Sequence, residues 1–188
     1  RREWSAADRA PVLEKAMQRL ALDRRDAQEI SAALKYFTTN TELPGPTGES
    51  NTLRLRGKGV ALALGGGGAV KQMLLCLAAG NVVIAVETDA AKSLAAALHD
   101  AGAPKGALSL AGPHASHALL KDRRIRLLAF DGGADARAAV EAVLAERKGP
   151  ILAVVSSLDA PWRYAAERAL TINTTAAGGD VRLLSLTE

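Results

Sequence analysis

The chain has 188 residues, enough for one domain with a substantial hydrophobic core. Only 3% of the residues are aromatic and the formal charge of +4 comes from scattered Lys and Arg, so the sequence lacks the stacking platforms and reader motifs of nucleic-acid-binding proteins. One cysteine, Cys76, excludes an internal disulfide and fits a reducing compartment, and no apolar run reaches membrane-spanning length. Because the sequence begins with Arg rather than Met, we expect a fragment or a processed product.

The amino-terminal third predicts two amphipathic helices followed by a linker. Apolar residues recur at helical spacing over roughly Ser5–Leu22 and again over about Arg25–Phe37. The next segment, Thr38–Asn51, contains Pro44-Gly45-Pro46, which disfavours both helix and ladder pairing, so it predicts an ordered loop or linker. It leads to Leu53–Arg56, an alternating strand. The sequence leaves open whether the two helices pack on the rest of this chain.

The centre of the chain predicts a β-α-β unit. Val60–Leu64 is a short apolar run that suits a buried parallel strand, and four glycines follow it. A helix is predicted from about Ala69 to Ala79, where Gly80-Asn81 supplies the left-handed residues that end helices. Val82–Val86 is the next buried strand.

The strand-helix alternation continues to about residue 155. Further elements are predicted at Asp89–Ala101 (helix), Ala107–Leu110 (strand), His114–Leu120 (helix), Ile125–Phe130 (strand), Ala134–Arg147 (helix) and Ile151–Val155 (strand). This order predicts an α/β fold with a Rossmann-like, doubly wound parallel sheet. In the tail, Arg168–Asn173 and Val181–Leu186 alternate, which predicts a long-looped β-hairpin or two strands that pair elsewhere. We expect this tail to be an arm that reaches a partner surface.

The four glycines, Gly65, Gly66, Gly67 and Gly68, are the first candidate site. Amides at a helix N-terminus attract phosphate, which suggests a dinucleotide site. However, the G-x-G-x-x-G pattern would need glycine where Val70 stands, and a phosphate loop would need Gly-Lys-Ser/Thr in place of Val70-Lys71-Gln72. A tight turn without a ligand is therefore the favoured interpretation.

Other reactive side chains form no recognisable catalytic or metal-binding pattern. His114 and His117 lack a third ligand, and Cys76 lies in an apolar helix, where a thiol is usually inert. Asp159 and Glu167 pair with no nucleophile in a known arrangement. From the residues alone we predict no catalytic residue and no metal ligand.

Several segments resemble the NAD-binding half of aldehyde dehydrogenases, in the same order along the chain. WSAADRAPVLEKAMQRL is similar to that family's amino-terminal helix, and LAAGNVVIAV to a helix end and the second strand. DAGAPKGALSLAGP is similar to the next helix-strand connection, and RLLAFDGGADA lies where the family carries its F-T-G-S-x-x-V-G turn.

Two further segments resemble the carboxyl-terminal region of long proline utilization A proteins. These segments are LPGPTGESNTLRL and RALTINTTAAGGDVRLLSL. The family's long members are bifunctional enzymes, which combine an FAD-dependent proline dehydrogenase with an NAD-dependent glutamate semialdehyde dehydrogenase and oxidise proline to glutamate. The resemblance therefore implies FAD and NAD in the parent enzyme.

The departures from the aldehyde dehydrogenase pattern imply a decayed copy. The family's proline-tryptophan-asparagine loop is replaced by the shorter Gly65–Gly68 turn, and its ribose-binding lysine aligns with Val86. Its Gly-Ser phosphate turn aligns with Gly132 and Gly133, and no segment corresponds to the catalytic domain. We therefore expect no cofactor in this segment, and the six glycines at 65–68, 132 and 133 are vestigial candidates.

The resemblance implies a non-catalytic carboxyl-terminal domain that supports the dehydrogenase module and seals its substrate-channelling cavity. Residues 1–42 would be a helical pair and linker, 43–167 the Rossmann-like domain, and 168–188 a β-flap or lid. The expected lid and interface residues are Arg168, Thr171, Asn173, Thr174, Thr175, Gly178 and Gly179. Its expected partners are the catalytic domains of the same polypeptide, or a second copy through the arm. The expected location is the cytoplasm, or the inner-membrane surface for the parent. The alternatives are a free-standing NAD-binding domain and an oligomerisation domain.

Overall fold

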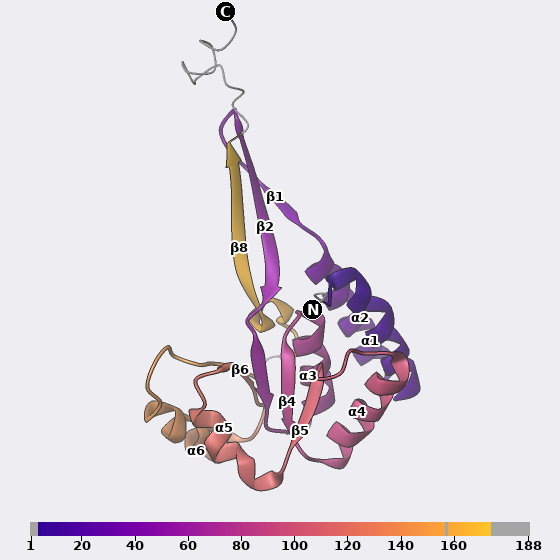
Figure 1. Cartoon of the computed structure of the whole chain (residues 1–188), viewed down its shortest axis with the longest axis vertical. Coiled ribbons are helices and arrows are strands. Elements are labelled where there is room, and N and C mark those ends of the chain that lie inside the picture. Colours follow the sequence, from indigo (N-terminus) through magenta and orange to yellow (C-terminus); the bar gives the residue numbers. More distant parts are fainter. Residues whose placement is uncertain (1–3, 157, 174–188) are drawn as a thin grey trace, which may run out of the picture.

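A computed structural model describes residues 4–156 and 158–173 of the chain. It has an α/β body from which a narrow β ribbon extends (Figure 1). Within this part of the chain, no helix is both long enough and apolar enough to cross a bilayer.

The body is built on a five-stranded, all-parallel sheet in the order β5-β4-β3-β6-β7. Its strands are β3 (Val60–Ala63), β4 (Val82–Val86), β5 (Leu108–Ala111), β6 (Ile125–Ala129) and β7 (Ala153–Val155). The strand order reverses between β3 and β6, which is the switch point of a doubly wound sheet. The predicted Rossmann-like fold class is confirmed.

Helices cover both faces of this sheet (Figure 1). One face carries α3 (Ala69–Ala78) and α4 (Asp89–Ala101), and these pack against α1 (Ala6–Arg19) and α2 (Arg24–Thr38) in one apolar core. A second cluster joins the other face to α5 (Ser116–Lys121) and α6 (Ala134–Ala145). The first two helices thus share the core of the sheet, which the sequence had left open; the division into three segments stays a prediction.

Several helix ends follow the predicted capping signals. Thr88 caps α4 by accepting a hydrogen bond from the Ala91 amide at 3.1 Å, and Gly102 ends the helix in the left-handed region, with φ 89°. Gly80 does the same after α3, with φ 94°.

A second, antiparallel sheet forms the ribbon, in the order β1-β2-β8. Its strands are β1 (Thr41–Leu43), β2 (Glu49–Gly57) and β8 (Ala165–Asn173), and β8 pairs with β2 along its whole length. The loop predicted over Thr38–Asn51 is therefore wrong in part, because it contains β1 and the first residues of β2. The prolines do not break the ladder because they lie in the turn between the strands, where the Glu49 amide bonds Pro46 O at 3.1 Å.

The tail is described only as far as Asn173, so the choice between a long-looped hairpin and two strands that pair elsewhere stays a prediction. Arg168–Asn173 belongs to β8, which pairs with β2. The second predicted strand, Val181–Leu186, lies outside the described residues. Elsewhere the predicted bounds agree to within three residues, and most of them to within the one or two by which element ends usually vary.

The buried side chain of Asn81 connects the ribbon to the body. Its Oδ1 accepts hydrogen bonds from the amides of Lys58 (2.7 Å) and Gly59 (3.1 Å), between β2 and β3. Its Nδ2 donates to the carbonyls of Cys76 (3.0 Å) in α3 and Tyr164 (2.8 Å), which immediately precedes β8. One amide thus fixes both strands of the ribbon where they leave the body.

We expect Asn81→Ala to lower the free energy of unfolding by about 2–4 kcal/mol, because it leaves several buried backbone groups without partners. Chemical denaturation measures this, with exposed Asn40→Ala as a control that should change stability by less than about 0.5 kcal/mol. Equal stability of the two variants would contradict the role given to Asn81.

Candidate functional site

The glycine turn Gly65–Gly68 connects β3 to α3 at the carboxyl edge of the parallel sheet. Gly65 and Gly66 both adopt positive φ angles, 101° and 120°, which only glycine adopts without strain. The turn lies beside the switch point between β3 and β6, where ligands bind in open α/β sheets. The structure therefore places this candidate where a dinucleotide phosphate would be expected.

The carboxylate of Asp131 occupies this position. Asp131 follows β6, and its Oδ2 accepts a hydrogen bond of 2.6 Å from the Gly68 amide at the N-terminus of α3. A Cβ atom at Gly66 would overlap its Oδ1. A carboxylate in this place takes the helix amide and the favourable end of the helix dipole that a phosphate would use, and its charge repels a second anion.

Leu158 covers the same helix end from another side. A Cβ atom at Gly68 would lie 2.7 Å from Leu158 Cδ1 and 2.9 Å from Asp131 Oδ2. The second glycine turn is also filled, since a Cβ atom at Gly132 would overlap the ring of Phe130, whereas Gly133 has open space around it. These contacts give a physical reason to expect no cofactor, which stays a prediction.

Lys71, one turn into α3, is held by carboxylates rather than facing a ligand. Its Nζ donates to Asp26 Oδ1 at 2.9 Å and to Glu29 Oε2, both on α2, and its side chain is 9% exposed. Burial lowers the pKa of Lys71, but the hydrogen bonds to Glu29 and Asp26 outweigh it and raise that pKa. The hydrogen bond from Lys71, and then that from Arg25, lowers the pKa of Glu29.

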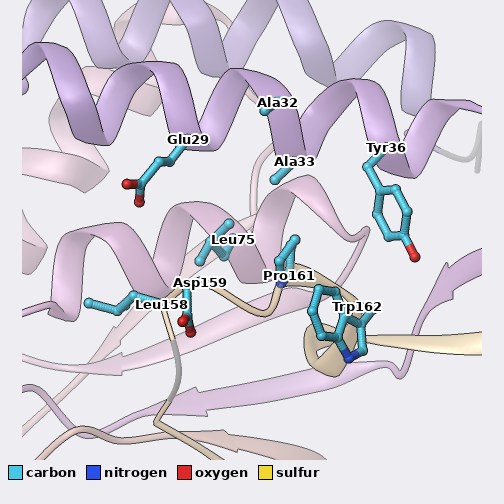
Figure 2. Close-up of a pocket in the computed structure, with 9 residues that line it drawn as sticks. All are labelled: Glu29, Ala32, Ala33, Tyr36, Leu75, Leu158, Asp159, Pro161 and Trp162. Carbon is cyan, nitrogen blue, oxygen red and sulfur yellow. The ribbon is translucent and has the colours of Figure 1, made fainter.

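A pocket of about 450 Å³ lies between α2, α3 and the segment after β7 (Figure 2). Its lining is mainly apolar, and Tyr36 and Trp162 lie at one end of it, each about half exposed. Of its carboxylates, that of Glu29 is already bound to Lys71 and Arg25. The pocket therefore offers mainly apolar packing surface, and its Glu29 carboxylate is held in ion pairs rather than free for acid-base chemistry.

The described residues contain no cluster of three or more side chains that could hold a metal ion, so His114 and His117 are not joined by further ligands there. Cys76 is fully buried, and desolvation raises the pKa of its thiol, which keeps it protonated and unreactive.

Three of the expected lid residues lie on β8 and are exposed. Arg168, Thr171 and Asn173 stand opposite Arg54, Asn51 and Glu49 of β2. Thr174, Thr175, Gly178 and Gly179 lie outside the described residues. In the described part of the chain, the glycine turns and the expected lid residues do not contact one another.

Sequence reasoning missed Asp131 as the residue that fills the glycine turn. A signal was present, because an acidic residue that directly follows a buried strand lies at the same sheet edge as the turn after the neighbouring strand. That β3 and β6 are neighbours was the missing information.

No protein-family model matches the sequence, and no curated protein matches it. Solved structures do. A single-residue variant of proline utilization A from Bradyrhizobium japonicum is 30% identical, with TM-score 0.63, over 79% of this chain and 19% of that chain. Proline utilization A from Bdellovibrio bacteriovorus, inactivated by N-propargylglycine, has TM-score 0.70 at 12% identity, over 80% and 20% of the two chains.

A putative aldehyde dehydrogenase from Burkholderia cenocepacia has TM-score 0.62 at 21% identity, over 80% of this chain and 39% of that chain. At this identity the likeness shows the fold alone. The chain spans about a fifth of the length of the proline utilization A chains that it matches. The resemblance drawn from sequence segments is thus confirmed: the chain is similar to an aldehyde-dehydrogenase-like domain of proline utilization A.

We expect Gly66→Ala to lower the free energy of unfolding by about 1–3 kcal/mol, because Ala is strained at this φ and its Cβ displaces the Asp131 carboxylate. The matched control is Gly67→Ala, whose added Cβ meets no described atom within 4 Å, and which should be neutral or slightly stabilising. Thermal or chemical denaturation compares the two, and equal effects would contradict the placement of Asp131.

A pH dependence follows from the lowered pKa of Glu29. A depressed carboxyl pKa stabilises the folded state above the pKa of the unfolded chain, and this contribution is lost as the pH falls through the folded-state pKa. The stability difference between the natural chain and Glu29→Gln should therefore be present near neutral pH and vanish in acid. Exposed Glu14→Gln is the control, and a difference that persists in acid would contradict the ion pair.

Proposed function

We propose that the chain is a non-catalytic carboxyl-terminal domain of a bifunctional proline dehydrogenase and glutamate semialdehyde dehydrogenase, which it supports and whose channelling cavity it seals. The parent would oxidise proline to glutamate with FAD and NAD, and this chain would supply neither catalytic residues nor cofactor ligands. The similarity to about a fifth of proline utilization A supports placing the chain within a larger polypeptide.

The observation that carries the non-catalytic role is the hydrogen bond from the Gly68 amide to Asp131. In this fold the first helix N-terminus at the switch point is the natural binding place for a dinucleotide phosphate. Here an internal carboxylate and the side chain of Leu158 enclose it. A domain that keeps the Rossmann-like fold but closes its own phosphate-binding site with Asp131 and Leu158 is suited to a supporting, non-catalytic role.

The ribbon supports the proposed lid. It extends well beyond the body (Figure 1), and it exposes apolar side chains on β8, with Leu170 39% and Ile172 51% exposed. Among the described residues β8 pairs along one edge only, with β2. A strand edge with exposed apolar side chains can add to a neighbouring surface and seal a seam against water, which would hold the aldehyde intermediate near its next site.

The same edge supports a second candidate, an oligomerisation domain in which the ribbons of two copies pair. Analytical ultracentrifugation tests it, and a monomer at high concentration would argue against it. The free-standing NAD-binding alternative is disfavoured by Asp131; heat or a thermal shift on titrating the chain with millimolar NAD would revive it.

The first test is the intact mass of the native gene product. A mass about five times the 19.5 kDa of this chain would support a domain of a larger enzyme. A product near 19.5 kDa would contradict it, and the oligomerisation candidate would then lead.

In the larger enzyme, we expect Ile172→Asp to lengthen the lag before NADH appears after proline is added, because a charge on the apolar edge weakens the seal. The rate with pyrroline carboxylate supplied directly should stay unchanged. Leu110→Asp, at a side chain that is 39% exposed on β5 of the body, is the control and should leave the lag unchanged. An unchanged lag in Ile172→Asp, and in a deletion of residues 168–188, would refute the lid.

A further inference from the structure

A second pocket, of about 430 Å³, lies at the amino edge of the parallel sheet, opposite the glycine turn. Its walls come from the residues that precede or begin β3, β6 and β7 and from the base of β8. Lys58, Arg126, Arg147 and Arg168 contribute four positive charges, and none of its lining residues is acidic. We call it the basic pocket.

Arg147 gives the basic pocket a fixed wall. Its guanidinium donates to three backbone carbonyls, those of Pro150 (2.9 Å), Ile125 (2.8 Å) and Asp122 (3.2 Å). Carbonyls hold the side chain in place without neutralising its charge. The nearby Asp122 carboxylate is bound by Arg124, whose hydrogen bonds lower its pKa to about 2.

Lys58 is held in the same way. Its Nζ donates to the carbonyl of Arg163 at 2.8 Å, again a neutral acceptor. Partial burial, and then the charge of Arg163, lower the pKa of Lys58. The surroundings of this amine are thus poor in negative charge.

The ribbon carries further cations on the face of β2 and β8 that contributes Ala166 and Arg168 to the basic pocket. Arg168 on β8 stands directly opposite Arg54 on β2, and Arg56 lies on the same face two residues further along. Like charges opposite one another destabilise a sheet. Arg54 Nε is buried without a hydrogen-bond partner in the described structure. The guanidinium groups of Arg126 and Arg168 have no ion pair or side-chain hydrogen bond among the described residues.

We propose that the basic pocket binds the phosphoryl group of a small phosphorylated molecule. Several guanidinium groups around one cavity match a dianion with three acceptor oxygens better than a single carboxylate, and Arg pairs with phosphate through two parallel hydrogen bonds. The pocket volume suits a small ligand, and the bound anion would relieve the repulsion between Arg54 and Arg168. The inference is independent of the proposed lid.

Isothermal titration calorimetry of the 188-residue chain with inorganic pyrophosphate tests the proposal. We expect binding that weakens as salt is added, and a roughly tenfold or greater loss of affinity in Arg126→Glu and Arg168→Glu. The control is Arg24→Glu, which makes the same change in net charge at an exposed position on α2 outside the pocket and should change affinity less than about twofold.

Arg168→Glu also separates lost binding from misfolding. It places an opposite charge across from Arg54, so its melting temperature should be unchanged or raised while its affinity falls. No binding at millimolar pyrophosphate would overturn the proposal, as would equal losses in the site and control variants. Binding of polyglutamate without binding of pyrophosphate would also overturn it and would indicate an acidic protein surface instead.

Discussion

The structure depends on the buried amide of Asn81, which makes four hydrogen bonds to backbone atoms from three separate segments. The ribbon strands leave the body at Gly57 and Ala165, on either side of these bonds. A side chain at Gly57 would overlap the carbonyl of Gly80, so the backbones of the two connections are also in close contact. The direction of the ribbon is therefore set by a junction in which the Asn81 amide has all of its hydrogen bonds satisfied, as the proposed lid would need in order to reach a defined surface.

In this domain the two edges of the parallel sheet carry the opposite charges from those usual in Rossmann-like folds. A Rossmann-like sheet offers helix amides to anions at its carboxyl edge, but here Asp131 takes one of these amides and Leu158 covers the helix end. At the amino edge, where such sheets rarely bind ligands, Lys58, Arg126, Arg147 and Arg168 surround a pocket without a carboxylate. An anion would thus meet repulsion at the first edge and attraction at the second.

This reversal is what the proposed non-catalytic role within a larger enzyme would lead one to expect. The internal ion pairs of Lys71 with Asp26 and Glu29 join α3 to α2, so the amine one turn into α3 contributes to packing rather than to ligand binding. The ribbon, with its exposed Leu170 and Ile172, and the basic pocket are two parts of the described surface that could bind another molecule. Both include residues of β8, so a substitution that moves the ribbon would alter both surfaces.

The sequence by itself determined the local elements and the order of the α/β fold, because apolar periodicity and residues such as Thr88, Gly80 and Gly102 act over a few neighbouring positions. It also indicated the resemblance to proline utilization A, through segments long enough to be specific. It misjudged Thr38–Asn51, because the prolines mark the turn between β1 and β2 and give no sign of the strands on either side, whose pairing only the fold reveals. Only the tertiary structure decided that Asp131 closes the glycine turn and that Lys58, Arg126, Arg147 and Arg168 share one pocket. These residues are far apart in sequence, and it is the pairing of β3 with β6 and of β2 with β8 that brings them together.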